Sequence, residues 1–162
     1  MPTIEIELSD VGLENAIRQL KGYAKKVKRV AKDSMKRLTV EGAEQAKQTA
    51  MFMNAYDSGE LVNGIVPEFK RDKGIIHSTA GHSAYVEMGT GVVGSNNPNP
   101  NGTMPGWKYD VNQHGEAGWN YIGRDGHLHW TKGMPSRPYM YDTAQKIKEA
   151  IPETVKEEFK RD

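Results

Sequence analysis

The stretch LENAIRQLKGYAKKVKRVAKDSMKRL, residues 13–38, decides the fold, because its apolar residues recur at spacings of three and four. These residues are Leu13, Ile17, Leu20, Ala24, Val27, Ala31, Met35 and Leu38. Such spacing places them along one side of an α-helix and leaves the cations on the other side. The pattern weakens at Gly42 and continues to Ala50. We therefore expect one long helix, or two with a bend at Gly42, ending near Met53.

A short strand is predicted just before this helix. Ile4, Ile6 and Leu8 alternate with two glutamates, which is typical of a strand with one wet face. Ser9 and Asp10 follow as candidate N-caps, because their side-chain oxygens can accept hydrogen bonds from the free amides of a first helical turn. We therefore place the start of the long helix here.

A second helix is predicted from Pro138 to about Arg161. Its apolar stripe consists of Met140, Ala144, Ile147, Ile151, Val155 and Phe159. Pro138 fixes the backbone angle that a first helical turn needs. Pro152 should bend the helix or split it after Ala150, since proline lacks the amide hydrogen.

The region between the two helices reads as strands and turns. Residues 61–66 suit a strand or a short helical turn, and residues 73–79 suit a strand that follows a charged turn. Residues 84–88 suit another strand, which runs into a glycine turn. We predict an α+β fold for a single domain, 1–162, with both helices packed on an antiparallel sheet of four or five strands.

Residues 92–132 have a different character and are predicted to form a long loop or β-excursion extending from the core. Residues 94–102 hold no apolar side chain, so we expect neither helix nor central strand there. Three aromatic-rich strand fragments are predicted, at 107–111, 119–121 and 128–130, and they contain all three tryptophans. Arg124-Asp125-Gly126 predicts a tight turn between the last two fragments.

The composition bounds the class of protein. With 162 residues, 36% hydrophobic content and a mean hydropathy of −0.72, the chain should form a modest core with much polar surface. Cysteine is absent, which excludes disulfides and thiolate chemistry. The N-terminus resembles no signal peptide and no run is long enough to span a bilayer. These features favour a soluble protein of the cytoplasm, without membrane partners.

Positive charge is concentrated in the long helix although the net charge is only +1. Residues 16–40 hold nine Lys or Arg and one acid, Asp33. Five of these cations form a possible surface for a polyanion or an acidic partner: Lys25, Lys28, Arg29, Lys32 and Lys36. The plainer interpretation is a solvated helix face, which is what most charge runs are.

The motifs that could carry chemistry are weak. Residues 89–94 match the dinucleotide fingerprint G-x-G-x-x-G, but the Asn- and Pro-rich residues that follow should not continue the helix that the motif requires. His127 and His129 could face one metal, with His114 upstream, but no third ligand has a defined spacing. Neither Ser83 nor Ser136 lies in a nucleophile elbow. We expect no catalytic residue, cofactor or metal; Glu87 should form an ion pair or cap a turn.

Three blocks of sequence, in this order, carry a resemblance to a family. They are residues 57–65, DSGELVNGI; residues 84–91, AYVEMGTG; and residues 133–140, GMPSRPYM. They resemble, in sequence and order, a minor-tail or tail-completion family of tailed bacteriophages and prophages, proteins of the neck. The positions that match the family pattern are Asp57, Gly59, Leu61, Tyr85, Glu87, Gly89, Thr90, Gly91, Gly133, Pro138 and Tyr139.

The resemblance implies a structural virion protein that completes the tail or joins it to the head as a ring of copies, for example six. Its implied partners are further copies and other neck or tail proteins, with only weak, nonspecific contact to DNA. It implies assembly in the host bacterial cytoplasm and residence in the virion. Two other classes stay open: a sequence-independent nucleic-acid-binding protein using helix residues 18–37, and a small hydrolase or toxin-like enzyme.

The chain departs from the family pattern in three places. The family's proline before the first block is absent, and Ala55 and Tyr56 stand there. Val62 and Gly64 occupy positions where a basic residue and a serine are common. The 92–132 region is also longer than in compact members, so no role of that region is carried over.

Overall fold

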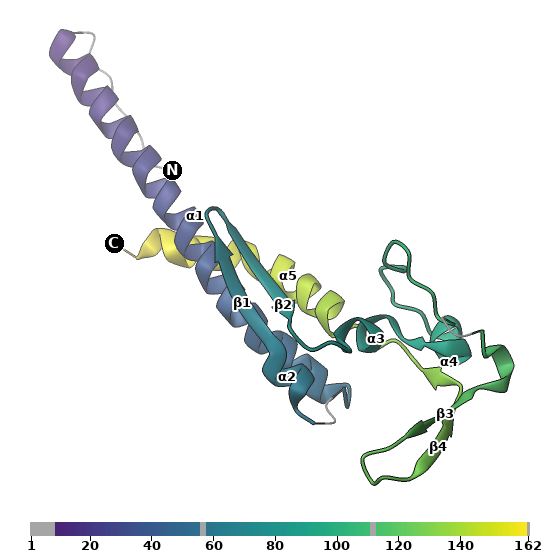
Figure 1. Ribbon diagram of the computed structural model, residues 1–162. Helices are drawn as coiled ribbons and strands as arrows, with labels where there is room; N and C mark the ends of the chain where they lie inside the picture. Colours follow the sequence, from purple (N-terminus) through teal and green to yellow (C-terminus); the bar gives the residue numbers. More distant parts are fainter. Residues whose placement is uncertain (1–8, 56–57, 111–112, 162) are drawn as a thin grey trace.

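The longest element of the computed structural model is a single helix, α1 (Asp10–Phe52) (Figure 1). The structure describes residues 9–55, 58–110 and 113–161, so the predicted strand at 4–8 lies outside the described residues. Ser9 caps α1: its side-chain oxygen accepts a hydrogen bond from the Gly12 amide at 3.1 Å. The helix ends where Asn54 adopts a positive φ of 51°, which turns the chain aside.

Helix α1 is not interrupted at Gly42, and this glycine permits close packing. A β-carbon at this position would lie 2.5 Å from Cδ1 of Ile147 and 2.6 Å from Cδ1 of Ile76. These two side chains come from helix α5 (Tyr139–Lys160) and strand β2 (Lys73–Ser78). The glycine therefore marks the place where both elements meet α1, and the helix continues through it.

The body of the protein is the C-terminal half of α1 packed against α5 and a β-hairpin (Figure 1). Helix α2 (Glu60–Gly64) leads into β1 (Ile65–Lys70), which pairs antiparallel with β2. In this register Ile65 lies opposite Ser78 and Lys70 lies opposite Lys73. Residues 61–66 were predicted to form either a strand or a short helical turn. The structure has both, because helix α2 ends at Gly64 and strand β1 begins at Ile65.

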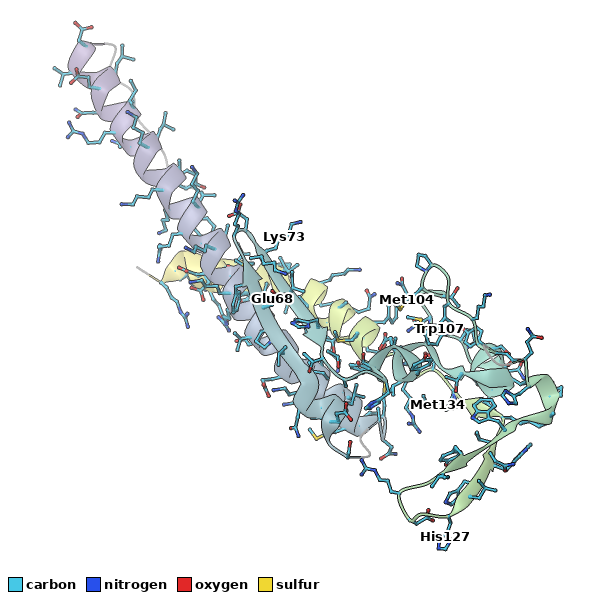
Figure 2. All side chains as sticks on the ribbon, in the orientation of Figure 1. Glu68, Lys73, Met104, Trp107, His127 and Met134 are labelled. Carbon is cyan, nitrogen blue, oxygen red and sulfur yellow. The ribbon has the colours of Figure 1, made fainter. Side chains whose placement is uncertain are left out.

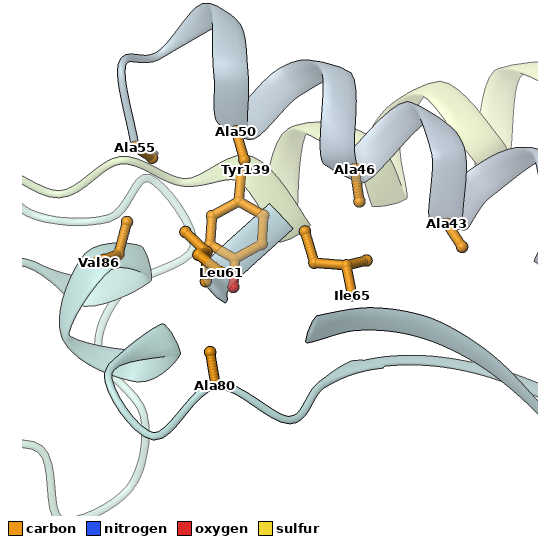
Figure 3. Close-up of a cluster of buried hydrophobic side chains, with 9 residues drawn as sticks. All are labelled: Ala43, Ala46, Ala50, Ala55, Leu61, Ile65, Ala80, Val86 and Tyr139. Carbon is orange, nitrogen blue, oxygen red and sulfur yellow. The ribbon is translucent and has the colours of Figure 1, made fainter. Parts of the chain in front are cut away.

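The core of the body centres on Tyr139, the largest fully buried side chain (Figure 3). Its ring lies among small and branched side chains from three other helices, from β1 and from the segment after β2: Ala43, Ala46, Ala50, Leu61, Ile65, Ala80 and Val86. The alanines of α1 leave the space that this ring fills, as close packing requires. Leu61 and Tyr139, both in the family-like blocks, are thereby core residues.

Helix α5 is one element through Pro152, so of the two predicted outcomes, a bend or a split after Ala150, the split is wrong. Pro152 and Lys148 are both exposed, and water can therefore satisfy the Lys148 carbonyl that the proline leaves without a donor. An ion pair also fastens α5 to α1, with Nη1 of Arg37 2.6 Å from Oε2 of Glu157.

A second lobe, built from residues 83–138, extends away from the body (Figure 1). It contains helices α3 (Ser83–Met88) and α4 (Gly91–Asn96), a short 3-10 helix η1 (Gly115–Ala117), and strands β3 (Trp119–Ile122), β4 (Leu128–Thr131) and β5 (Gly133–Met134). Strands β3 and β4 pair only with each other, and β1 and β2 do likewise. The α+β class is confirmed, but two separate hairpins replace the predicted sheet of four or five strands.

Two further predictions in this lobe are wrong. Helix α4 reaches Asn96, so residues 94–96 are helical despite their polar composition. Residues 107–110 are not a strand, and Val111 lies outside the described residues. The strand fragments around the Arg124-Asp125-Gly126 turn are confirmed as β3 and β4.

Candidate functional site: the Glu87 junction

Residues 84–88, predicted as a strand, belong to helix α3. Val86, Glu87 and Met88 are all buried. A strand would direct these successive side chains to alternate faces, whereas a helical turn spreads them toward neighbours on several sides. The turn is closed by a 2.8 Å hydrogen bond from the Gly89 amide to the Tyr85 carbonyl. Tertiary burial thus overrides the alternating sequence pattern.

Glu87 joins α3 to the first turn of α5. Its Oε2 accepts a hydrogen bond from the Met140 amide at 3.0 Å, and its Oε1 accepts one from the Tyr141 amide at 3.1 Å. Oε1 also accepts one from Nδ2 of Asn99 at 3.1 Å. We call this meeting of residues 85–91, Asn99 and residues 133–141 the Glu87 junction. The expected capping role of Glu87 is confirmed, with a helix N-terminus as the capped element.

The Glu87 carboxylate supplies the hydrogen-bond acceptor and the negative charge that Pro138, next to the start of α5, does not provide. The residue before the helix is Pro138, and it has no side-chain hydrogen bond to the first turn. The sequence suggested that Pro138 is the first residue of the helix. In the structure Pro138 precedes the helix, which begins at Tyr139. Free amides and the positive end of the helix dipole both favour a negative group there. Glu87 provides this group from 53 residues away in sequence.

Burial governs the protonation of this site. The Glu87 side chain is largely withdrawn from water, which raises the pKa of its carboxyl above the ordinary value. The hydrogen bonds from Met140, Tyr141 and Asn99 act in the opposite direction. Burial likewise raises the pKa of the neighbouring Tyr139 hydroxyl to about 12. The Tyr139 hydroxyl is therefore far from the neutral pKa that favours proton transfer.

Asn99 is the junction residue that the sequence did not reveal. It is 3% exposed, and its Nδ2 also donates to the Glu87 carbonyl at 3.1 Å. It stands in the Asn- and Pro-rich run of 94–102, where nothing distinguishes it from the other asparagines. Ser136 completes the set, because its Oγ donates to the same carbonyl.

The two glycine-bearing blocks meet backbone to backbone at the junction. Thr90 and Met134 form one antiparallel bridge, and Gly91 and Gly133 form the next. A β-carbon on Gly133 would collide with the Thr90 carbonyl oxygen, and one on Gly91 would collide with the Lys132 carbonyl oxygen. Residues 84–91 and 133–140, the second and third sequence blocks, are therefore in direct contact in space.

Gly89 turns the chain at the end of α3 with a φ of 79°, a region that glycine adopts readily. A β-carbon here would also lie 2.7 Å from the Ser136 amide nitrogen. Gly94, the first residue of the run that was predicted to be neither helix nor strand, is buried in α4 instead. Its β-carbon would lie 2.8 Å from the Gly89 carbonyl carbon and 3.0 Å from the Met134 carbonyl oxygen.

We predict that both Gly89→Val and Gly94→Val destabilise the protein, and that Gly89→Val does so more. The strained backbone at Gly89 should cost about 1–3 kcal/mol in addition to the steric overlap. Gly94 has ordinary backbone angles and suffers only the overlap. Urea denaturation of the two variants and of Gly22→Val, where a β-carbon meets open space, measures the difference. A Gly89 variant as stable as the Gly22 variant would contradict this account of the turn.

The remaining family-like positions are dispersed around the junction. Tyr85 is half-exposed, with its ring 5.3 Å from that of Trp107, and Oγ1 of Thr90 accepts a hydrogen bond from the Met134 amide. Gly59 precedes α2 with a φ of 80°. Asp57 lies outside the described residues. The described residues of the first block therefore contribute Leu61 and Ile65 to the core and none to the junction.

The five basic residues singled out on α1 are all exposed. They are Lys25, Lys28, Arg29, Lys32 and Lys36. Arg29 also donates to the carbonyl of Arg161 at the end of α5. A hollow of about 530 Å³ lies beside Lys28 and Lys32, with Arg71 and Asp72 on its other side. The structure thus keeps these cations at the surface of one helix and apart from the Glu87 junction.

The weaker motifs form no recognisable chemical site. The Gly91 amide donates to the Tyr109 carbonyl at 2.7 Å, so it is not free for a phosphate. Nε2 of His129 lies 2.9 Å from Oδ2 of Asp125, while the His114 ring packs near Trp119. In residues 9–55, 58–110 and 113–161, no three His, Asp or Glu side chains are grouped to hold a metal.

The chain matches no known protein-family model, and no curated protein or solved structure is significantly similar to it. Within the part of the chain that the structure describes, no helix is long and apolar enough to cross a membrane.

Proposed function

We propose that this protein is a structural subunit of the neck of a tailed phage or prophage. It completes the tail or joins it to the head as a ring of identical copies, assembled in the bacterial cytoplasm. The proposal is supported by three family-like blocks in family order. It is also supported by the contact between the second and third blocks at the Glu87 junction, which fixes the second lobe to the body.

The exposed apolar face of the β3–β4 hairpin is the observation that best supports an assembly role. Ile122, Leu128 and Trp130 lie on one face of it, and they are 75%, 70% and 58% exposed. An isolated two-stranded hairpin is marginal in water, and exposed apolar clusters commonly mark binding surfaces. The hairpin projects from the second lobe, with His127 at its tip (Figure 2). This exposed apolar face supports the proposal that the hairpin contacts a neighbouring copy in the ring.

The double substitution Ile122→Asp and Leu128→Asp should abolish ring assembly and leave the body folded. Light scattering with size-exclusion chromatography should give a mass of several chains for the wild type at high concentration and a lower mass for the variant. Arg124→Asp is the matched control, since it places an acid at the exposed turn of the same hairpin. A wild type that forms no higher oligomer at any concentration would contradict the proposed function.

Nucleic-acid binding is the second candidate, favoured by the exposed cations of α1. A protein that tolerates a passing genome needs only weak, sequence-independent contact, with a Kd of about 10⁻⁴ to 10⁻⁶ M at physiological salt. Replacing Lys25, Lys28 and Lys32 by Glu should remove this binding, while the circular dichroism spectrum stays that of the wild type. Fluorescence anisotropy over a salt series measures the effect. Nanomolar, sequence-specific binding would instead favour a regulator.

A further inference from the structure

Strand β2 has one edge that carries no other strand within the described part of the chain, because β2 pairs with β1 alone. Pro67 of β1 lies opposite Ile76 of β2. Proline has no amide hydrogen, so within a strand it suits a position whose backbone groups point away from the neighbouring strand. Opposed residues of an antiparallel pair alternate between hydrogen-bonded and non-hydrogen-bonded pairs. The backbone groups of Gly74, Ile76 and Ser78 therefore point toward the open edge of β2.

Two hollows lie beside this open edge, between β2 and α5. The first is an apolar groove of about 480 Å³, lined by Gly74 and Ile76 of β2, by α1, and by Ile151 of α5. The second, of about 510 Å³, extends from Ser78 to Lys148 of α5. Ile151 is 43% exposed, so the apolar groove is open to the surface. An unpaired strand edge beside an open apolar surface is a place where a further strand can add.

The β3–β4 hairpin has an edge and a face that match this place. The Gly123 amide donates to the His127 carbonyl at 2.8 Å, and this bond fixes the alternation of the pairs that follow. The backbone groups of Leu128 and Trp130 therefore point away from β3, toward the open edge of β4. Their side chains lie on the exposed apolar face of the hairpin, as that of Ile122 does. On β2, likewise, edge residues line the apolar groove.

We propose that β4 of one copy adds, antiparallel, to the open edge of β2 in a second copy. Leu128 then lies opposite Ile76 of the partner subunit, and Trp130 lies opposite Gly74 of the partner subunit. Because glycine has no side chain, Trp130 has access to the apolar groove. The two hairpins lie far apart within one copy, so the pairing joins two copies (Figure 1). It forms a four-stranded sheet, β1-β2-β4-β3, over α1 and α5, like the sheet that the sequence predicted for a single chain.

The charges beside the two hairpins agree with this register. Lys132, which directly follows β4, comes opposite Asp72 of the partner subunit, in the β1–β2 turn. Nζ of Lys132 lies 3.2 Å from Oε2 of Glu116 in its own chain, which brings Glu116 toward Arg71 of the partner subunit. Opposite charges therefore meet across the contact. A parallel β4, or a shift of β4 by two residues, would separate Lys132 from Asp72 of the partner subunit.

This pairing rests on the proposed function and names the surface to which the hairpin binds. The hairpin of one copy and the groove of the next are different surfaces, so the contact is heterologous. Each copy has one of each, and the same contact can therefore repeat from copy to copy around a ring.

The absence of cysteine permits a direct cross-linking test. In this register His129 lies opposite Ile75 of the partner subunit in a non-hydrogen-bonded pair. The α-carbons of such a pair are about 4.5 Å apart, which suits a disulfide. Ile75→Cys and His129→Cys chains are purified separately, mixed with oxidised glutathione and run on a non-reducing gel. The mixture should yield a disulfide-linked dimer, and either variant alone should yield little.

Glu68→Cys replaces Ile75→Cys as the control for this experiment. Glu68 lies opposite Ile75 on β1, so it is one strand further from the added β4 and out of reach of a disulfide. A mixture of Ile75→Cys and His129→Cys that gives no more dimer than the control mixture would overturn the strand pairing.

A charge placed in the apolar groove gives a second readout. Ile151→Asp should raise the concentration at which half of the chains are assembled by about tenfold or more, as measured by sedimentation velocity. Ala150→Asp is the matched control, because this exposed neighbour on α5 does not line the groove. Both variants should keep the circular dichroism spectrum of the wild type. Assembly of Ile151→Asp at the wild-type concentration would overturn the strand pairing.

The two experiments together separate this inference from the proposed function. Cross-linked dimers whose wild-type parent never forms rings would support the strand pairing and contradict the ring. Assemblies that depend on Ile122 and Leu128 but give no cross-link between Ile75→Cys and His129→Cys chains would support the ring and overturn the strand pairing. Chains that stay single at every concentration would overturn both.

Discussion

Replacing Tyr139 by alanine should lower the free energy of unfolding by about 3–5 kcal/mol, the range for removal of a fully buried aromatic side chain. Tyr139 is 1% exposed and its ring fills the space between α1, α2 and α3 (Figure 3). Its neighbours on α1 are Ala46 and Ala50, which are too short to close the cavity. Urea denaturation followed by circular dichroism measures the loss.

Two variants test whether the loss of stability in Tyr139→Ala comes from removing the buried ring at this position. Tyr121→Ala removes a half-exposed tyrosine from β3 and should leave the unfolding midpoint of the body close to that of the wild type. Tyr139→Phe keeps the ring and removes only the hydroxyl, so it should cost about 0.5–1.5 kcal/mol. If Tyr139→Ala were as stable as Tyr121→Ala, the core would not be organised around this ring.

Glu87→Ala should lower the free energy of unfolding by about 2–4 kcal/mol, since it leaves the Met140 and Tyr141 amides without an acceptor at a partly buried helix start. The loss should be concentrated where α5 meets α3. Hydrogen exchange of the Met140 and Tyr141 amides should accelerate more than that of amides at the other end of α5. Denaturation and exchange together measure both consequences.

The matched control is Glu149→Ala, which removes an exposed glutamate from α5 and should be near neutral. Asn99→Ala should reproduce part of the Glu87→Ala effect, because it removes one donor to the carboxylate and one to the Glu87 carbonyl. Unchanged exchange of the Met140 amide in Glu87→Ala would show that the carboxylate does not hold the start of α5.

The helices could be predicted from the sequence because their signals are local. The apolar spacing and the Ser9 cap located α1, and a second stripe located α5. The β3–β4 turn was found in the same way from Arg124-Asp125-Gly126. In each case the residues that determine the element lie within it.

The Glu87 junction could not be assembled from the sequence because its members are distant in the chain. Glu87, Asn99 and Met140 are joined only through the fold, and no local pattern marks Asn99. The prediction of a strand at residues 84–88 was wrong for the same reason, since burial on several sides makes this segment the helix α3. The sequence predicted only that Glu87 forms an ion pair or caps a turn; that it caps the start of α5 required the structure.

The continuity of α1 has a mechanical consequence. At 1.5 Å per residue, this 43-residue helix is a rod roughly 65 Å long, and the wall of the Tyr139 core that it forms is rigidly continuous with its N-terminal end. A tilt of about 10° at Gly42, where Ile147 of α5 meets α1, would displace the N-terminal end of α1 by about 8 Å, given a distance of roughly 48 Å from Gly42 to Asp10. Packing at Gly42 and Ile147 therefore sets the direction in which the N-terminal end of α1 points. A substitution there would redirect that end without altering any residue on its surface.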